Sequence, residues 1–265
     1  MSRELLPPPL AHVGGQAINL ADGEDALARV GAYLQAGEGF TFATLNLDHL
    51  VKLRQNPAFR AAYARTTLVT ADGAPVAAMA RETAPQVRRT TGADLFQPLC
   101  AVAARAGAPI ALFGSSQDSL EQAAAELRAK IDGLAVVHVE APSQGFDPCS
   151  AEADAAGARI AASGARLVFV CLGAPKQEIF ADRMARRHPG LGFVGVGASA
   201  DFVAGAQKRA PLLAQKMGLE WFWRMATNPR RLAWRYLQCA VLLAQLKLER
   251  ALAGAPAQPL HTPGE

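Results

Sequence analysis

The sequence predicts an α/β fold: a Rossmann-like parallel sheet with helices on both faces, followed by a basic, helical C-terminal appendage. The first observation is that short apolar segments of strand length alternate with segments whose apolar residues recur at helical spacing. That alternation is typical of parallel sheets, because each strand returns through a helix that covers one face. The second observation is that Lys and Arg are concentrated near the C-terminus. A chain of 265 residues that is 51% hydrophobic can bury a substantial core in one or two domains.

The first part of the chain contains a lead-in and the first elements of the sheet. Residues 1–20 are Pro-rich and are expected to hold at most one strand. Asp22–Gln35 is predicted to be a helix because Ala26, Val30 and Leu34 share one face. The elements predicted next are a strand at Phe40–Leu45, helices over Leu47–Arg65 interrupted at Pro57, a short strand at Thr67–Thr70, and helices at Ala74–Arg81 and Ala93–Ala106.

The second part of the chain repeats the alternation with more apolar strands. Arg166–Leu172, with the sequence RLVFVCL, is predicted to be a buried strand. Pro175–Arg187 is predicted to be a helix with Pro in its first turn, where the missing N–H breaks no hydrogen bond. The other elements predicted here are strands at Pro109–Phe113, Leu134–Val139 and Leu191–Val196, and helices at Asp118–Ile131 and Ala151–Ser163.

The net charge of +4 is unevenly distributed. Residues 1–206 hold 18 basic and 20 acidic residues, whereas residues 207–251 hold nine basic and two acidic residues, a net charge of +7. All three Trp residues also lie in this second segment. We therefore expect an α/β core over residues 1–206, a helical appendage over residues 207–251 that suits an anionic partner, and a Pro/Ala/Gly-rich disordered tail over residues 252–265.

Missing motifs argue against several classes of protein. The four Cys residues are far apart and form no CxxC or Cys/His cluster, so we expect neither zinc nor disulfides, and a reducing compartment. No GxxxxGK[ST] motif is present and no GxGxxG follows a predicted strand, which disfavours Walker-type hydrolases and dinucleotide-binding enzymes. The N-terminus has no apolar signal core, and no run reaches the roughly 18 apolar residues of a spanning helix. No RNA-binding module is recognisable, so no nucleic-acid partner is expected.

Polar residues or glycines follow most of the predicted strands. Ligands of open parallel sheets bind outside the carboxyl ends of the strands, so residues at these positions should gather at one rim. Thr44 and Asn46 are expected to point to the same side there, because side chains alternate along a strand. The residues expected at the rim are Asn46, Asp72, Ser115, Gln177 and Asp201.

Each of these features also has a purely structural explanation. Asn46 is a typical helix N-cap, and Asp72-Gly73 is a typical tight turn. A carboxylate at the rim would instead be placed to accept a proton from an alcohol. Gly114-Ser115-Ser116 either supplies an N-cap or lets an anion or a sugar approach the start of a helix. Arg88-Arg89 either forms a solvated surface pair or binds phosphate.

Two further segments allow both structural and functional interpretations. Lys176, Gln177 and Glu178 open a predicted helix after a buried strand: Lys176 suits a phosphate, Gln177 suits a sugar hydroxyl, and Glu178 matches the positive end of the helix. The basic appendage contains GLEWFWR (218–224) and PRRLAWRY (229–236). These aromatic residues either pack on the core in an ordinary C-terminal helix, or lie at headgroup level in a membrane interface beside Arg on anionic lipid.

Taken in order, these motifs resemble the WecG/TagA/CpsF glycosyltransferases (glycosyltransferase family 26). The resemblance covers about residues 15–240. It departs from the family at Ser115, where a second Gly is common, and at Ala198-Ser199-Ala200, so no particular donor sugar is inferred. The matching segments are Thr44-Leu45-Asn46, Ala71-Asp72-Gly73, Gly92-Ala93-Asp94-Leu95, Phe113-Gly114, Gly173-Ala174-Pro175-Lys176-Gln177-Glu178, Gly195-Val196-Gly197, Lys208-Arg209-Ala210-Pro211, Gly218-Leu219-Glu220-Trp221, Arg224 and Pro229-Arg230-Arg231.

The resemblance implies a bacterial enzyme that moves a sugar from a UDP-sugar to a polyprenyl-diphosphate-linked acceptor, with inversion and with no metal or other cofactor. Its products would be intermediates of exopolysaccharide, common antigen or teichoic acid type polymers. Residues 1–206 would be the catalytic core, and residues 207–251 would attach it peripherally to the inner face of the cytoplasmic membrane. A non-catalytic, membrane-docked nucleotide-sugar binding protein and a Rossmann-like NAD or SAM enzyme stay open as alternatives, and a homo-oligomer is compatible with all three.

The match to the family also implies roles for individual residues. Asp72 would be the general base, and Arg89 would lie near the diphosphate, so these two are the expected catalytic residues. Of the remaining residues, Thr44, Asn46 and Gln177 would line the sugar pocket, and the appendage arginines would close over the nucleotide. The expected substrate-binding residues are Thr44, Asn46, Gly114, Ser115, Lys176, Gln177, Asp201, Arg209, Arg224 and Arg231, with no metal ligand.

Overall fold

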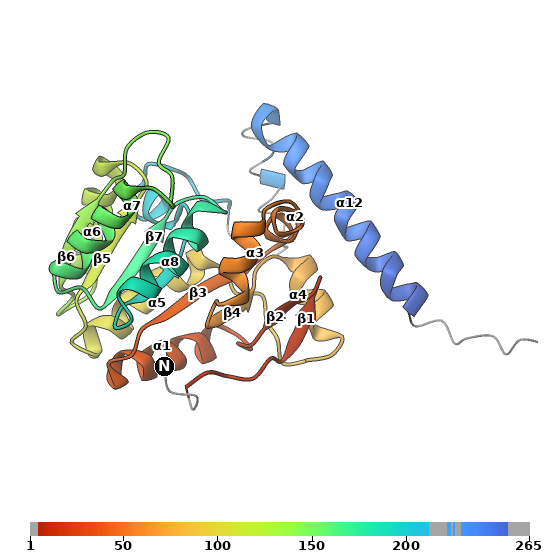
Figure 1. Ribbon diagram of the computed structural model, residues 1–265, viewed down its shortest axis with the longest axis horizontal. Helices are drawn as coiled ribbons and strands as arrows, with labels where there is room; N and C mark the ends of the chain where they lie inside the picture. The colour runs from red at the N-terminus through yellow and green to blue at the C-terminus, as the bar shows by residue number, and fades with distance from the viewer. Residues whose placement is uncertain (1–4, 212–221, 224, 226–228, 254–265) are drawn as a thin grey trace, which may run out of the picture.

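A six-stranded parallel sheet forms the centre of the computed structural model, which describes residues 5–211, 222–223, 225 and 229–253 (Figure 1). Each pair of neighbouring strands is parallel, in the order β4-β3-β8-β7-β5-β6. The predicted fold class is therefore confirmed. The strands of this sheet are β3 (Phe40–Leu45), β4 (Leu68–Ala71), β5 (Ile110–Gly114), β6 (Val136–Glu140), β7 (Leu167–Cys171) and β8 (Gly192–Gly195).

Helices cover both faces because the central strands are apolar on both sides. In β7, Leu167 and Phe169 pack into one hydrophobic cluster, while Val168 and Val170 pack into another on the opposite face. The helices of the first face are α1 (Gly23–Ala36), α5 (Gly92–Arg105), α6 (Gln117–Lys130) and α9 (Ser199–Val203). Those of the second face are α2 (Leu47–Gln55), α3 (Pro57–Ala64), α4 (Ala74–Arg81), α7 (Ala151–Ala162) and α8 (Lys176–Arg187).

The predicted ends of these elements lie within two residues of the observed ends, and side-chain caps explain where several helices begin. Asn46 Oδ1 accepts a hydrogen bond from the His49 backbone N–H at 3.0 Å, which caps α2. Asn56 caps α3 in the same way, directly before Pro57. Ser116, and not Ser115, caps α6. Ser115 is therefore left without a capping role.

Two elements of the structure are missing from the sequence prediction. The lead-in contains an antiparallel hairpin of two strands, β1 (Ala11–Val13) and β2 (Gln16–Ile18), where at most one strand is expected. Gly14 and Gly15, which join them, both have positive φ, and a Gly-Gly pair between strands is a recognised hairpin signal. The short helix α9 was also not predicted, because its five residues are too few to show a helical period.

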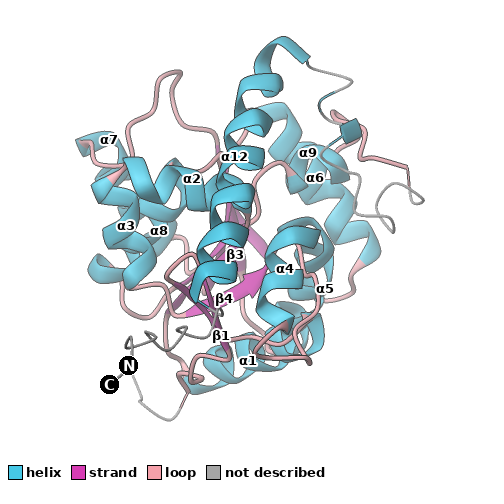
Figure 2. Cartoon of the chain, turned by 90° about the vertical axis from the view of Figure 1, so that its right-hand side faces the viewer, coloured by secondary structure: helices cyan, strands magenta, loops and turns pink. Residues whose placement is uncertain are grey.

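The C-terminal helix α12 (Pro229–Ala253) packs against α2 (Figure 2). Cys239, Leu242 and Leu246 are buried in the cluster that α2 shares. By contrast, Trp234 is 68% exposed, and Trp223 is also exposed. The interpretation in which the appendage packs its aromatic residues on the core is therefore wrong for Trp234. Among the described residues, no helix combines the length and the apolar character that crossing a bilayer requires.

Strands β5 and β7 approach each other closely where they end at the rim. Gly114 has a φ of +120°, and a Cβ atom there would lie 2.6 Å from the carbonyl carbon of Cys171. The next residue, Ser115, donates its backbone N–H to the Cys171 carbonyl oxygen at 2.9 Å. Only glycine satisfies both the backbone conformation and this contact.

Substituting Gly114→Ala is therefore expected to lower the free energy of unfolding by at least about 2 kcal/mol, since the backbone must shift to admit the methyl group. Urea unfolding measures the effect. The control is Gly190→Ala, because that Cβ would meet no atom within 4 Å and no positive φ is required. Equal stabilities of the two variants would contradict the close approach of β5 and β7.

Candidate active site

A half-buried carboxylate lies where β3 and β4 end side by side. Asp72 directly follows β4, and its backbone N–H donates to the carbonyl oxygen of Leu45 at 2.8 Å. The parallel register pairs Thr44 with Thr70 and Leu45 with Ala71. Asp72 therefore comes level with Asn46, and its side chain meets those that leave the end of β3.

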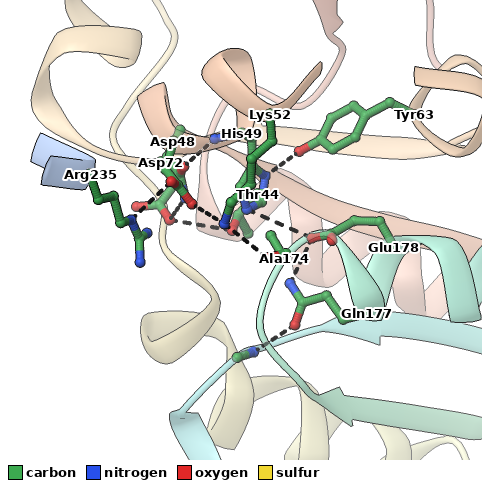
Figure 3. A network of polar contacts seen from close by, with 12 residues as sticks. Thr44, Asp48, His49, Lys52, Tyr63, Asp72, Ala174, Gln177, Glu178 and Arg235 are labelled. Carbon is green, nitrogen blue, oxygen red and sulfur yellow. Dashed lines mark hydrogen bonds and ion pairs between the residues drawn. The ribbon is translucent and has the colours of Figure 1, made fainter. Parts of the chain in front are cut away.

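Thr44 and Asn46 both reach this carboxylate. The Thr44 hydroxyl and the Asn46 Nδ2 amide each donate to Asp72 Oδ2 at 3.4 Å (Figure 3 shows the Thr44 side). Asn46 also caps α2 through its Oδ1 atom. The two explanations of Asn46 are therefore compatible, because the cap turns the amide so that its NH₂ group faces Asp72.

Gln177 lies buried in the first turn of α8, with both ends of its amide bound. Its Nε2 donates to Glu178 Oε1 at 2.7 Å, and its Oε1 accepts the Gly197 backbone N–H at 3.1 Å. Gly195 leaves room for it, because a Cβ atom there would lie 2.8 Å from Gln177 Nε2 and displace that side chain. Lys176, one residue earlier, is exposed. The amide is thus held in one orientation at the rim, while the ammonium reaches solvent.

A buried polar chain stands behind Gln177 (Figure 3). Glu178 Oε1 lies 3.8 Å from His49 Nε2, and His49 Nδ1 is 2.8 Å from the Tyr63 hydroxyl. Burial lowers the pKa of His49 to about 3, so its ring is neutral, and burial raises the pKa of Glu178 to about 7. Burial also raises the pKa of Tyr63, and the charges of Glu178 and Asp72 add to that shift. No sequence motif predicts His49 or Tyr63 at this site, and Glu178 is expected only to match the positive end of its helix.

A second polar group lies at the other half of the rim. The Ser115 hydroxyl donates to Asp201 Oδ1, and Gln207 Nε2 donates to Asp201 Oδ2 at 2.8 Å. Ser115 has a φ of +37°. It lies at the end of β5, beside β7. The chain continues from β5 to β6 on one side of this point, and from β7 to β8 on the other side. Such a reversal opens the crevice in which doubly wound sheets bind their ligands.

Two arginines meet at one carboxylate beside the end of β4. Arg89 forms an isolated parallel bridge with Ala71, and its Nη2 is 4.0 Å from Asp94 Oδ2. Arg209 Nη2 lies 2.6 Å from Asp94 Oδ1. Burial would raise the pKa of Asp94, but hydrogen bonds from Arg209 and Thr91 outweigh it and hold that pKa below its ordinary value. The first residues of the basic appendage are thus joined to the core next to Asp72.

The structure brings most of the expected site residues to one rim of the sheet, in two groups. The first group is centred on Asp72 and the second on Ser115 and Asp201. Arg224 lies outside the described residues, and Arg231 belongs to α12 but its side chain is not described. Within the described part of the chain, no group of three or more His, Cys, Asp and Glu residues has an arrangement that could hold a metal ion. The expected site residues placed at the rim are Thr44, Asn46, Asp72, Arg89, Gly114, Ser115, Lys176, Gln177, Asp201 and Arg209.

The variant Glu178→Gln tests the buried, neutral state of this carboxyl group. The ordinary Glu pKa is about 4.3, and the folded pKa is raised, so the stability that this group contributes is complete at low pH and is lost as pH rises through about 7. The free energy of unfolding of the unmodified protein, relative to that of the variant, should therefore fall by up to about 3 kcal/mol between pH 4 and pH 8. Urea unfolding across this range measures it. Glu121→Gln, at an exposed carboxylate of α6, is the control, and pH profiles of wild type and Glu178→Gln that run parallel would contradict the assignment.

A family comparison agrees with this geometry. The model described as "Glycosyl transferase WecG/TagA/CpsF family" matches residues 11–254. The match includes every strand of the sheet, both polar groups at the rim and helix α12. Members of this family act in the synthesis of cell-surface polysaccharides. The chain belongs to the WecG/TagA/CpsF family of glycosyltransferases.

Proposed function

We propose that this glycosyltransferase transfers a sugar from a UDP-sugar to a polyprenyl-diphosphate-linked sugar, with inversion, and that Asp72 is its general base. The observation that carries the proposal is the Asp72 carboxylate at the ends of β3 and β4, with two side-chain donors on one of its oxygens. Inversion requires an acceptor hydroxyl to attack the anomeric carbon from the side opposite the leaving UDP. A base within hydrogen-bond reach of that hydroxyl accepts its proton as the new bond forms.

The surroundings of Asp72 suit a base. Thr44 and Asn46 both donate to Oδ2, so they orient the carboxylate and restrict its rotation. We assign this carboxylate to the acceptor hydroxyl. The Thr44 side chain is almost fully buried, so its position is fixed by packing and not by the substrate.

Arg89 and Arg209 are suited to the leaving diphosphate. As the glycosidic bond to UDP breaks, negative charge grows on the diphosphate, and nearby guanidinium groups stabilise it electrostatically. Both arginines lie at Asp94, next to the strand that ends in Asp72. In our proposal the diphosphate takes over part of this pairing from Asp94, and the arginines supply the stabilisation that a metal ion would otherwise give.

We assign the rest of the donor to the crevice between β5 and β7. Gly114 brings the backbone close there, and Ser115 and Asp201 offer a hydroxyl and a carboxylate, groups that can bind a ribose or a base edge. Gln177 lies between this half of the rim and the Asp72 group, because its Oε1 accepts the Gly197 N–H just past β8, the strand between β7 and β3. A donor lying across the sheet would thus place its nucleotide over β5 and β7 and its sugar near β3.

Replacing Asp72 with Asn keeps the shape and removes the basic oxygen. Turnover of a UDP-sugar with a polyprenyl-diphosphate-linked acceptor should fall by about 10²- to 10⁴-fold, since that is the usual contribution of a general base. A UDP-release assay over a panel of UDP-hexoses, UDP-N-acetylhexosamines and UDP-uronic acids measures it. Asp118→Asn, at an exposed carboxylate in the first turn of α6, is the control.

Turnover of Asp72→Asn close to that of wild type would contradict the role of this residue. Activity is expected to persist in EDTA, and dependence on added Mg²⁺ or Mn²⁺ would contradict the assignment of leaving-group stabilisation to the arginines. Binding of UDP-sugar by wild type with no UDP released for any acceptor would favour the non-catalytic alternative.

We also propose that α12 attaches the enzyme peripherally to the inner face of the cytoplasmic membrane. Its apolar residues Trp234, Leu237, Val241 and Leu248 are each at least half exposed, and helical spacing puts them on one stripe. This stripe is separate from the buried residues that hold α12 on α2. An apolar stripe on a basic segment is typical of helices that lie in the headgroup region.

Val241→Glu should weaken flotation with vesicles that contain anionic phospholipid, because it puts a carboxylate among the inserted apolar side chains. The adjacent Ala240→Glu is the matched control: its side chain is exposed on the same helix, but lies off the apolar stripe. Equal flotation of the two variants would contradict docking through this stripe.

A further inference from the structure

A continuous chain of polar contacts leads from α12 to the turn that carries Gln177 (Figure 3). Arg235 Nε of α12 lies 2.9 Å from Asp48 Oδ1. Lys52 Nζ donates to Asp48 Oδ2 at 2.6 Å, and also to the carbonyl oxygen of Ala174 at 2.8 Å. Helix α12, helix α2 and the turn at Ala174, which are far apart in the sequence, thus meet at Asp48 and Lys52.

The burial of Asp48 makes these contacts costly to break. Asp48 is 7% exposed, and each of its carboxylate oxygens has one cationic partner. Each cation compensates part of the charge on this buried carboxylate, so removing one of them costs more than the loss of a surface pair. The positions of Arg235 and Lys52 are therefore linked through Asp48.

Lys52 transmits this link to the rim. Ala174 precedes Lys176 by two residues and Gln177 by three, within the turn between β7 and α8. Lys52 donates a hydrogen bond to a backbone carbonyl of that turn, so it restrains the position of the turn relative to α2. Asn46, the N-cap of the same helix, contacts Asp72. α2 thus positions the two sides of the site relative to each other.

A second polar bridge between α2 and α12 does not extend to the turn. Arg54 Nη1 donates to Gln245 Oε1 at 2.8 Å, and Arg54 Nη2 lies 3.8 Å from Glu249. Both of these contacts are exposed. A variant of Arg54 is therefore a control: it weakens the contact between α12 and α2 without touching the Arg235–Asp48–Lys52 chain.

We propose that Asp48 and Lys52 are positioning residues. Through them, the position of α12 on α2 determines the geometry of residues 173–178, which are the turn after β7 and the first residues of α8. Arg235 holds Asp48, Asp48 holds Lys52, and Lys52 holds the Ala174 carbonyl. Placement of α12 then tightens the turn that presents Lys176 and Gln177. Any effect of this coupling on catalysis rests on the proposed function. The structural coupling between α12 and the turn does not.

Hydrogen–deuterium exchange of the full-length protein without substrate tests the link directly. Amide exchange in residues 173–178 should be at least about five-fold faster in Lys52→Met and Arg235→Gln than in wild type, because each variant releases the turn. The double variant should exchange no faster than Lys52→Met alone, since both act through one chain. Arg54→Gln should leave exchange in the turn unchanged, and Arg235→Lys, which keeps a cation at Asp48, should restore most of the protection.

Three outcomes would overturn the proposal: exchange in the turn that is unchanged in Arg235→Gln, equal increases in Arg54→Gln and Arg235→Gln, or effects that add in the double variant. Far-UV circular dichroism shows whether a variant unfolds. If Arg235→Gln does, amide exchange of the turn in Arg235→Lys decides instead: exchange as slow as in wild type supports the link, and faster exchange contradicts it. In the UDP-release assay, kcat/KM should fall in Lys52→Met and Arg235→Gln but not in Arg54→Gln. If the wild type releases no UDP, the proposed function is contradicted. The hydrogen–deuterium exchange result, measured without substrate, still tests the coupling.

Discussion

The parallel pairing of β3 and β4 is the constraint on which the site depends. Because Leu45 lies opposite Ala71, the residues one step further on, Asn46 and Asp72, leave the sheet at the same level. The backbone bond from Asp72 to Leu45 continues that pairing past the end of the strand. A shift of one residue would turn Asp72 to the other face of the sheet and separate it from Thr44. The chemistry is thus determined by the register of two buried strands.

The helix that follows β3 extends this constraint outward. α2 takes its N-cap from Asn46, and within its first two turns it presents Asp48, His49 and Lys52 toward partners on other elements. Polar groups removed from water must be paired, so each of them restricts the element it meets: α12, α3 or the turn before α8. One short helix therefore relates Asp72, the buried Glu178 and the C-terminal helix to one another.

Much of this arrangement is predictable from the sequence because it depends on local patterns. Apolar strands and helical periods give the layers, and residues that directly follow strands, such as Asp72 and Ser115, must lie at the carboxyl edge of a parallel sheet. The contacts that cross the chain are different. Lys52 and Ala174 are 122 residues apart, and nothing in their local sequence indicates that an ammonium would meet that carbonyl. The exposure of Trp234 also depends on how α12 turns on α2, which the composition of the helix leaves open.

The central claim is that Asp72 faces the attacking hydroxyl while the arginines face the leaving group. The most direct measurement is a crystal structure of the Asp72→Asn protein with a UDP-sugar and a short-chain lipid-diphosphate acceptor. The account predicts an acceptor hydroxyl about 2.6–3.2 Å from the side chain at position 72, on the side of the anomeric carbon opposite the diphosphate, with Arg89 or Arg209 at the diphosphate oxygens. A donor bound with its anomeric carbon away from the ends of β3 and β4 would contradict it.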